Sequence, residues 1–328
     1  MTAAPFDPKA AVVYGRFVQA AYTMYRSDPN NLTPPPSADF PAGYQLSAWI
    51  TMQDFILTST KPIFYGFIAH SIANTNHSVL AIRGTSNGIE WWDDANALIK
   101  TPFKVPGCGE VGMGFARIYD TLEIIEHRIA IAAAAPRSLK PVGSFSQQVS
   151  ELVRGRAAAA PRREEAAAPV SIEVTGHSLG GALATLYTME NAKIDKLPNP
   201  AICTFASPLV GDSTFAAAFN GLNLTSWRVV NAQDLVPMLP PEFLGFTHVA
   251  TEKRFNSIGK VWPSPSCWHA LATYLSLIDP SLQPGADCQL ISLAVAAAPR
   301  AAAPVPAVTT LSVPAGPVTI NITVNVGK

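Results

Sequence analysis

The stretch SIEVTGHSLGGALA, residues 171–184, decides the fold of this sequence. Apolar and polar residues alternate up to Val174, as in a β-strand, and a run of alanine and leucine with good helix propensity ends the stretch. Between them, Gly176, Ser178 and Gly180 form the pattern G-x-S-x-G. This pattern predicts a sharp turn from strand to helix, with the serine hydroxyl presented at its apex.

A serine in such a turn has two interpretations. It can simply cap a helix that begins in a glycine-rich loop. Alternatively, it can be a nucleophile, because backbone N–H groups and the positive end of the helix dipole at that position stabilise a developing oxyanion. The strand before the turn and the helix after it favour the second interpretation, so we expect Ser178 to be a nucleophile.

Composition and charge limit the class of protein. The 328 residues suffice for one large α/β domain or two small ones, and 48% hydrophobic residues can fill a sizeable core. Lys+Arg and Asp+Glu both number 23, and no basic run alternates with aromatic residues, so we expect no nucleic-acid partner. No run approaches the ~18 consecutive apolar residues of a membrane-spanning helix. Residues 1–8 show no signal-peptide pattern, and the sequence leaves the compartment open.

The cysteines give no sign of a metal site. Cys108, Cys203, Cys267 and Cys288 form no C-x-x-C pair and no cluster with histidine, so we expect neither zinc nor another metal or cofactor. Cys203 lies in an apolar run and is expected to be a buried thiol. Cys267 and Cys288 could form a disulfide, which the sequence alone leaves open.

Other regions of the chain show helix and strand patterns. Asp7 followed by Pro8 predicts the start of a helix that lies on a sheet. Apolar residues from Phe115 to Ile129 have helical spacing, and Thr247–Phe255 is expected to be a hairpin. The predicted strands are Ser47–Gln53, Ile63–His70, Ser78–Arg83, Ala201–Ala206 and Trp227–Asn231, and Trp268–Ile278 is predicted to be the last long helix.

An amphipathic pattern over residues 89–103 predicts a further helix. Trp91, Trp92, Leu98 and Ile99 fall on one of its faces, and charged residues cover the other. Such a helix either packs on the core as an ordinary surface helix or acts as a lid whose tryptophans meet lipid.

Two segments differ in composition from the rest. Residues 137–169 are rich in alanine, arginine and proline, which predicts an exposed, solvated helical insertion. From residue 294 onward, Ala-Pro repeats predict a linker, followed by a strand candidate at Val318–Val326 that is either an edge strand or an interaction element. We therefore expect one domain over 1–293 and a linker with a tail over 294–328.

A nucleophilic serine needs a base and an acid that orients the base. On this type of fold the acid and then the histidine follow the serine in the chain. Asp234 lies just past the apolar strand end Val229–Val230, where catalytic groups of parallel sheets gather. His269 begins the last helix, where a loop can bring it over Ser178, whereas His248 lies in a strand-like stretch and is expected to be structural.

Seven short segments occur in an order that is typical of one family. They are AIRGT (81–85), GFARIY (114–119), TGHSLGGALA (175–184), FASPLVGD (205–212), VNAQDLVP (230–237), FTHV (246–249) and CWHALATY (267–274). Together they resemble the class 3 lipases, the fungal-type triacylglycerol lipases among the α/β-hydrolases. The resemblance extends over about residues 47–277, and the segments 137–169 and 294–328 have no counterpart in it.

The resemblance implies a fold and a site. The fold would be that of the α/β-hydrolases, with a central, mostly parallel sheet flanked by helices and a helical lid at about residues 89–103. Ser178 would be the nucleophile, Asp234 the orienting acid and His269 the base. The oxyanion hole would consist of the Leu179 N–H and the Thr85 N–H, with a possible contribution from the Thr85 hydroxyl.

The expected function is hydrolysis of carboxylic esters. We expect first a triacylglycerol lipase that acts on acylglycerols or other acyl esters at a lipid–water interface, outside the cell as the resemblance favours. A phospholipase A1 or a feruloyl-type esterase is the alternative within the enzymes. A lipid-binding protein that has kept the fold without activity is the alternative from another class. The sequence gives neither acyl-chain preference nor oligomeric state.

Overall fold

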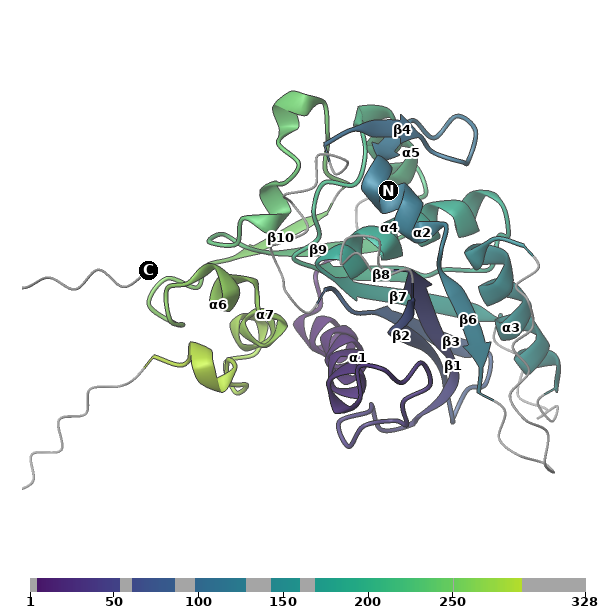
Figure 1. The fold of residues 1–328 in the computed structure, drawn as a ribbon, viewed down its shortest axis with the longest axis horizontal. Helices are drawn as coiled ribbons and strands as arrows, with labels where there is room; N and C mark the ends of the chain where they lie inside the picture. Colours follow the sequence, from purple (N-terminus) through teal and green to yellow (C-terminus); the bar gives the residue numbers. More distant parts are fainter. Residues whose placement is uncertain are drawn as a thin grey trace, which may run out of the picture. The chain divides into compact units, whose positions relative to one another are not determined.

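Figure 1 shows the computed structural model of the chain, which describes residues 5–53, 61–85, 98–127, 143–159, 169–249 and 251–290. Contacts within the chain group Met1–Leu290 into one compact unit, and this unit is described below. The tail 291–328 lies outside the described residues. The expected linker, the strand candidate Val318–Val326 and the domain boundary at residues 293–294 therefore stay predictions.

Within the described part of the unit, helices and strands alternate between residues 113 and 231. The helices are α1 (Pro8–Ser27), α2 (Met113–Tyr119), α3 (Phe145–Ala159), α4 (Leu179–Lys193), α5 (Ser213–Asn220), α6 (Pro265–His269) and α7 (Leu271–Ile278). The strands are β1 (Tyr44–Gln53), β2 (Pro62–Ser71), β3 (His77–Ile82), β4 (Lys100–Pro102), β5 (Glu110–Gly112), β6 (Glu123–Glu126), β7 (Ser171–His177), β8 (Ala201–Phe205), β9 (Thr225–Asn231) and β10 (Glu252–Phe255).

An eight-stranded sheet lies at the centre, in the order β10-β9-β8-β7-β3-β2-β1-β6. Neighbouring strands run parallel from β10 to β3 and antiparallel from β3 to β6. The mostly parallel sheet that the sequence predicts is therefore present. Its central strand β8 is buried along its whole length and consists mostly of apolar residues, as strands covered on both faces do.

Helices cover both faces of the sheet (Figure 1). On one face, α1 packs Phe17 against Phe67, and α7 packs Leu275 against Phe205. On the other face, α2 to α5 pack on the central strands. The predicted start of α1 is confirmed, because the Asp7 side chain accepts hydrogen bonds from the backbone N–H groups of the first turn.

The helix expected over residues 115–129 is wrong beyond its first part. Helix α2 ends at Tyr119, and Glu123–Glu126 forms the edge strand β6, which pairs antiparallel with β1. The apolar residues of this segment also suit a strand whose side chains are only half-buried. The segment forms a strand rather than a helix because its backbone pairs with the free edge of β1.

The expected solvation of residues 137–169 is wrong for α3. Its residues Phe145, Val149, Leu152 and Val153 are buried in the main core, against α4 among other elements. Residues 128–142 and 160–168 lie outside the described part of the chain. That the segment is an insertion relative to the family stays a prediction.

Three further elements differ from those expected. The helix over 89–103 does not reach its predicted end, because Lys100–Pro102 is strand β4, paired antiparallel with β5. The expected hairpin at Thr247–Phe255 is instead the single strand β10, parallel to β9. The last long helix is broken at Ala270, whose backbone is extended (φ −61°, ψ 130°). Within the described residues, no helix is both long enough and apolar enough to span a membrane.

Candidate active site

The turn between β7 and α4 holds Ser178 in a strained conformation. Its φ is 57° and its ψ −128°, a region that non-glycine residues rarely adopt. Its backbone N–H donates to the carbonyl of Phe205 at 2.9 Å. The turn is so tight that a Cβ at Gly176 would collide with the carbonyl of Gly180. The sequence pattern thus produces the sharp strand-turn-helix, with Ser178 directly before the first residue of α4.

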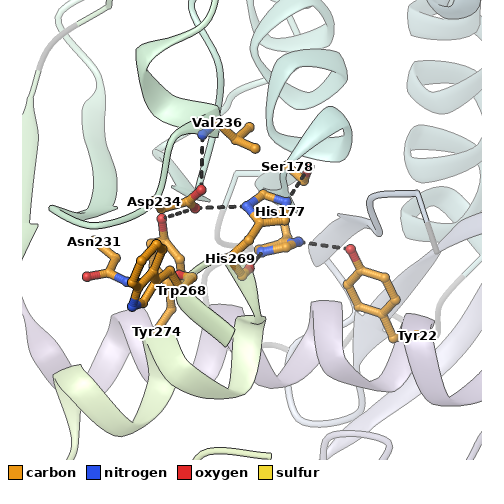
Figure 2. Close-up of polar contacts among 9 residues, drawn as sticks. All are labelled: Tyr22, His177, Ser178, Asn231, Asp234, Val236, Trp268, His269 and Tyr274. Carbon is orange, nitrogen blue, oxygen red and sulfur yellow. Dashed lines mark hydrogen bonds and ion pairs between the residues drawn. The ribbon is translucent and has the colours of Figure 1, made fainter. Parts of the chain in front are cut away.

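The structure brings the three residues singled out in the sequence together (Figure 2). Nε2 of His269 lies 2.8 Å from Oγ of Ser178, and Nδ1 of His269 lies 2.8 Å from Oδ2 of Asp234. A carboxylate accepts hydrogen bonds, so Nδ1 of His269 carries the proton and Nε2 is left to accept from the serine hydroxyl. All three residues are buried, with Ser178 only 1% exposed. This arrangement can remove a proton from Ser178 as the hydroxyl attacks.

Asp234 is fixed by groups other than His269. Its Oδ1 accepts from the backbone N–H of Val236 at 3.0 Å, and its Oδ2 accepts from the hydroxyl of Tyr274 at 2.6 Å. Burial and the neighbouring Asp234 charge hold the pKa of Tyr274 well above its usual value, so the hydroxyl stays a donor. The sequence reasoning missed Tyr274, although it lies five residues after His269 in the same predicted helix.

The segment that carries His269 is anchored at the two residues before the histidine. The Asn231 side-chain amide donates to the carbonyl of Trp268 at 2.9 Å, and Cys267 forms a disulfide with Cys288. The break at Ala270 ends α6 directly after His269. These contacts leave the imidazole directed at Ser178 from the end of a short helix.

The segment Arg83-Gly84-Thr85 lies beside the serine turn. The buried guanidinium of Arg83 donates to the carbonyls of Phe64 and Gly84 and stacks 3.6 Å from the ring centroid of Tyr25. The Thr85 Oγ1 is buried and has no hydrogen-bond partner within the described residues. A buried hydroxyl without a hydrogen bond lowers the stability of the fold, and a substrate oxygen could accept the missing bond. The Thr85 hydroxyl is therefore suited to be an oxyanion donor.

His177, the residue before Ser178, faces away from the serine hydroxyl. Its Nδ1 lies 2.8 Å from the Tyr22 hydroxyl of α1, and its Nε2 lies 2.8 Å from the carbonyl of His269. These contacts tie His177 to α1 and to the His269 segment, so that its side chain supports the serine turn. Tyr22 was missed, because it repeats at the helical spacing of ordinary core residues.

Other residues considered from the sequence have no hydrogen bond to this centre that the described part of the chain shows. His248 places its Nε2 2.5 Å from the carbonyl of Pro237, and burial lowers its pKa to about 4, as expected for a structural histidine. Cys203 is a buried free thiol. Trp91 and Trp92 lie outside the described residues, whereas Leu98 and Ile99 are 42% and 50% exposed. Across the described ranges, no group of three or more His, Cys, Asp or Glu side chains could hold a metal ion.

Comparison with known sequences finds a family and several relatives. The family model described as "Lipase (class 3)" matches residues 79–244. Phospholipase A1-II 3 of Oryza sativa subsp. indica is 30% identical over 294 residues, which cover 83% of this chain and 62% of that protein. Secreted mono- and diacylglycerol lipase 1 of Fusarium solani is 30% identical over 174 residues, covering 53% of this chain and 42% of the relative. The chain thus spans less than two thirds of the length of these curated relatives.

Comparison with solved structures gives the same fold. Lipase II from Rhizopus niveus matches with a TM-score of 0.55 and 21% identity, over 75% of this chain and 80% of that one. The lipase from Rhizopus microsporus var. chinensis matches with a TM-score of 0.55 and 22% identity, over 77% and 76%. The α/β-hydrolase fold predicted from the sequence is confirmed; the helical lid of that prediction lies largely outside the described residues.

Proposed function

This chain belongs to the class 3 lipase family, and on that premise we propose that it is a carboxylic ester hydrolase that cleaves acylglycerols through an acyl-enzyme on Ser178. The single observation that carries the proposal is the continuous hydrogen-bonded line from Ser178 Oγ through the His269 ring to Asp234. Such a line converts a weakly nucleophilic alcohol into a strong one when a carbonyl carbon comes within reach.

The proposed reaction has two halves. Oγ of Ser178 attacks the ester carbonyl carbon while Nε2 of His269 takes its proton, and the carbonyl oxygen becomes an oxyanion. The backbone N–H groups of Leu179 and Thr85 and the Thr85 hydroxyl are the proposed donors to that oxyanion. The C–O bond to the alcohol then breaks, and the alcohol leaves with the proton from His269. Water repeats the attack in the second half, returns a proton through His269 to Ser178, and releases the carboxylic acid.

Triacylglycerol is our first candidate substrate, with other acylglycerols beside it. Support comes from the class 3 lipase model and from the Fusarium solani relative, whose name refers to mono- and diacylglycerols. A second candidate is phospholipase A1 activity, which the rice relative favours because that match extends over 83% of this chain. The two activities share the acyl-enzyme chemistry and differ in the group attached to the glycerol.

We further propose that a lid within residues 89–99 controls access to the site. Ser178 is 1% exposed, so an ester can reach its hydroxyl only after part of the chain moves aside. Opening at a lipid surface would bring Trp91, Trp92, Leu98 and Ile99 into contact with lipid. The rate should then rise abruptly when the substrate concentration passes its solubility limit, and a smooth hyperbolic rise through that limit would remove the lid from the proposal.

Labelling of the serine tests the proposal against a catalytically silent lipid-binding protein. The purified chain is incubated with a p-nitrophenyl alkylphosphonate, with and without detergent, and the release of nitrophenol and the adduct mass are measured. We expect one equivalent of label on Ser178 and none on Ser178→Ala or Asp234→Ala over the same time. A folded wild-type chain that takes up no label in detergent would contradict the proposal and favour the silent protein.

A substrate panel separates the candidate activities. Emulsified triacylglycerol, phosphatidylcholine with distinguishable sn-1 and sn-2 chains, and a feruloyl ester are compared at equal concentrations of labelled active sites. Faster release from triacylglycerol supports the first candidate. Release confined to the sn-1 chain of phosphatidylcholine identifies phospholipase A1, and preference for the feruloyl ester would overturn both glycerolipid assignments.

A further inference from the structure

A chain of hydrogen bonds crosses the molecule just behind the proposed nucleophile. The backbone N–H of Gly84 lies 2.8 Å from the hydroxyl oxygen of Tyr22, and that hydroxyl lies 2.8 Å from Nδ1 of His177. Nε2 of His177 lies 2.8 Å from the backbone carbonyl of His269. The chain therefore connects the end of β3, the N-terminal helix α1, the serine turn and the end of α6.

The direction of every hydrogen bond in this chain can be derived. The carbonyl of His269 can only accept, so Nε2 of His177 must carry a proton. In a neutral imidazole Nδ1 is then an acceptor, and the Tyr22 hydroxyl must donate to it. The Tyr22 oxygen is thereby left to accept from the Gly84 N–H. All four groups are satisfied in one arrangement only, with His177 neutral.

The surroundings keep both side chains in the required protonation states. Burial, and secondarily the nearby His269 ring, hold the pKa of His177 well below its usual value, and the two ring centroids are 4.8 Å apart. Burial raises the pKa of Tyr22 to about 12, so its hydroxyl remains a donor at neutral pH. A neutral His177 also avoids repulsion when His269 takes up a proton during the reaction.

Each end of this line of hydrogen bonds lies next to a group that the proposed reaction needs. Gly84 precedes Thr85, a proposed oxyanion donor, and the carbonyl of His269 belongs to the residue that serves as the base. The fit at Gly84 is tight, because a Cβ there would lie 2.6 Å from the Tyr22 hydroxyl oxygen and 2.8 Å from Cβ of Ser178. Small displacements in this chain would therefore move the oxyanion donor, the nucleophile and the base relative to one another.

From this geometry we infer that Tyr22 and His177 are positioning residues, which hold the oxyanion segment, the serine turn and the His269 segment at fixed distances through one line of hydrogen bonds. The inference rests on the proposed function and extends it to a residue of the N-terminal helix. Neither side chain touches the reacting atoms, so their effect should appear in the rate of acyl transfer rather than in substrate binding.

Tyr22→Phe is the central test, because it removes one hydroxyl and keeps the ring. Its matched control is Tyr25→Phe in the same helix, whose ring, rather than its hydroxyl, contacts Arg83. Both variants and the wild type are titrated with the phosphonate to count working sites, and kcat and KM are then measured per site on p-nitrophenyl butyrate. We expect kcat of Tyr22→Phe to fall about 10- to 100-fold with KM within about twofold, and Tyr25→Phe to match the wild type.

Two substitutions at His177 show which of its two hydrogen bonds, to Tyr22 or to the His269 carbonyl, supports the reaction rate. His177→Gln places an amide N–H near the position of Nε2 and should keep the bond to the His269 carbonyl, whereas His177→Asn should keep only an acceptor for Tyr22. If Tyr22 acts through His177, adding Tyr22→Phe to His177→Gln should lower kcat little further. If Tyr22→Phe folds poorly, His177→Gln still tests the inference, because it also removes the hydrogen bond between Tyr22 and residue 177.

The outcomes separate the inference from its premise. If the wild type neither takes up label nor turns over ester, the proposed function fails. If the wild type is active and Tyr22→Phe has the kcat per titrated site of Tyr25→Phe, the positioning role is wrong. A lower melting temperature with fewer titrated sites but unchanged kcat per site also overturns it, because the hydroxyl would then stabilise the fold alone.

Discussion

The hydroxyl of Tyr274 donates a 2.6 Å hydrogen bond to Oδ2 of Asp234, the same oxygen that lies 2.8 Å from Nδ1 of His269. One carboxylate oxygen therefore serves two donors, and Tyr274 limits how far it can turn away from the imidazole. The second oxygen is held by the backbone of Val236. The orientation of the base thus depends on a tyrosine that lies five residues beyond it, past the helix break at Ala270.

Tyr274→Phe should weaken both the fold and the reaction. The lost bond goes to a buried acidic group, which typically costs about 1.5–3 kcal/mol in the free energy of unfolding. We expect a fall of that size in urea unfolding and a roughly tenfold lower kcat per titrated site, from looser orientation of His269. Tyr187→Phe is the control, because the buried hydroxyl of Tyr187 has no hydrogen-bond partner among the described residues. Equal losses in the two variants would contradict the role of Tyr274.

Thr85→Val tests whether the threonine hydroxyl is an oxyanion donor. The valine keeps the shape of the side chain, and the hydroxyl it removes has no partner within the described ranges, so stability should change by less than about 1 kcal/mol. Loss of one oxyanion donor costs about 100-fold or more in kcat, and Thr85→Ser should restore most of the rate. Thr273→Val removes another buried hydroxyl for which the described residues offer no partner, and it serves as the control. Full activity in Thr85→Val would leave only the backbone N–H groups of Leu179 and residue 85 as oxyanion donors.

The local part of the site was predictable from the sequence. The turn at Ser178 follows from glycines and small residues within five positions, and Gly176 is required by the close approach of the Gly180 carbonyl. The positions of Asp234 and His269 follow from chain order and from the ends of predicted elements, and the structure brings both to Ser178. Their catalytic roles stay predictions until the variants are measured.

The features that were predicted wrongly or overlooked depend on contacts between residues far apart in the sequence. The strand at Glu123–Glu126 exists because β1 offers a free edge, and Lys100–Pro102 is a strand because Glu110–Gly112 pairs with it. Neither partner is visible in a local pattern. Tyr22 and Tyr274 fit the helical spacing of core residues, so no local pattern singles out their hydroxyls, whose partners lie 155 and 40 positions away.

The Cys267–Cys288 disulfide should stabilise the fold more than it supports catalysis. It closes a loop with a sequence separation of 21, for which chain entropy predicts about 3 kcal/mol. The double variant Cys267→Ala/Cys288→Ala should therefore unfold roughly 5 °C lower. Its kcat per titrated site at 25 °C should stay within about threefold, because Asn231 and His177 still hold the carbonyls of Trp268 and His269. Cys108→Ala, which removes a buried free thiol, should shift melting less, and a melting temperature of the double variant that equals the wild type's would contradict the stabilising role.

The buried His70 should make the protein less stable as the pH falls. Its Nδ1 lies 2.7 Å from Oγ of Ser47, and burial, with a smaller contribution from Arg156, lowers its pKa to about 4. The unfolded chain, with a histidine pKa of about 6.5, binds a proton below that pH that the native state does not, so stability present above pH 6.5 is lost towards pH 4.

His70→Asn isolates this contribution from that of the carboxylates, which titrate in the same range in both proteins. The asparagine oxygen can still accept from Ser47, but the side chain binds no proton. Between pH 6.5 and 4, the free energy of unfolding of the wild type should fall more steeply than that of the variant, by up to about 1.4 kcal/mol per pH unit. Above pH 7 the two curves should run parallel. Urea unfolding at half-unit pH intervals measures both, and curves that stay parallel down to pH 4 would show that His70 takes up its proton as readily in the native state as in the unfolded chain.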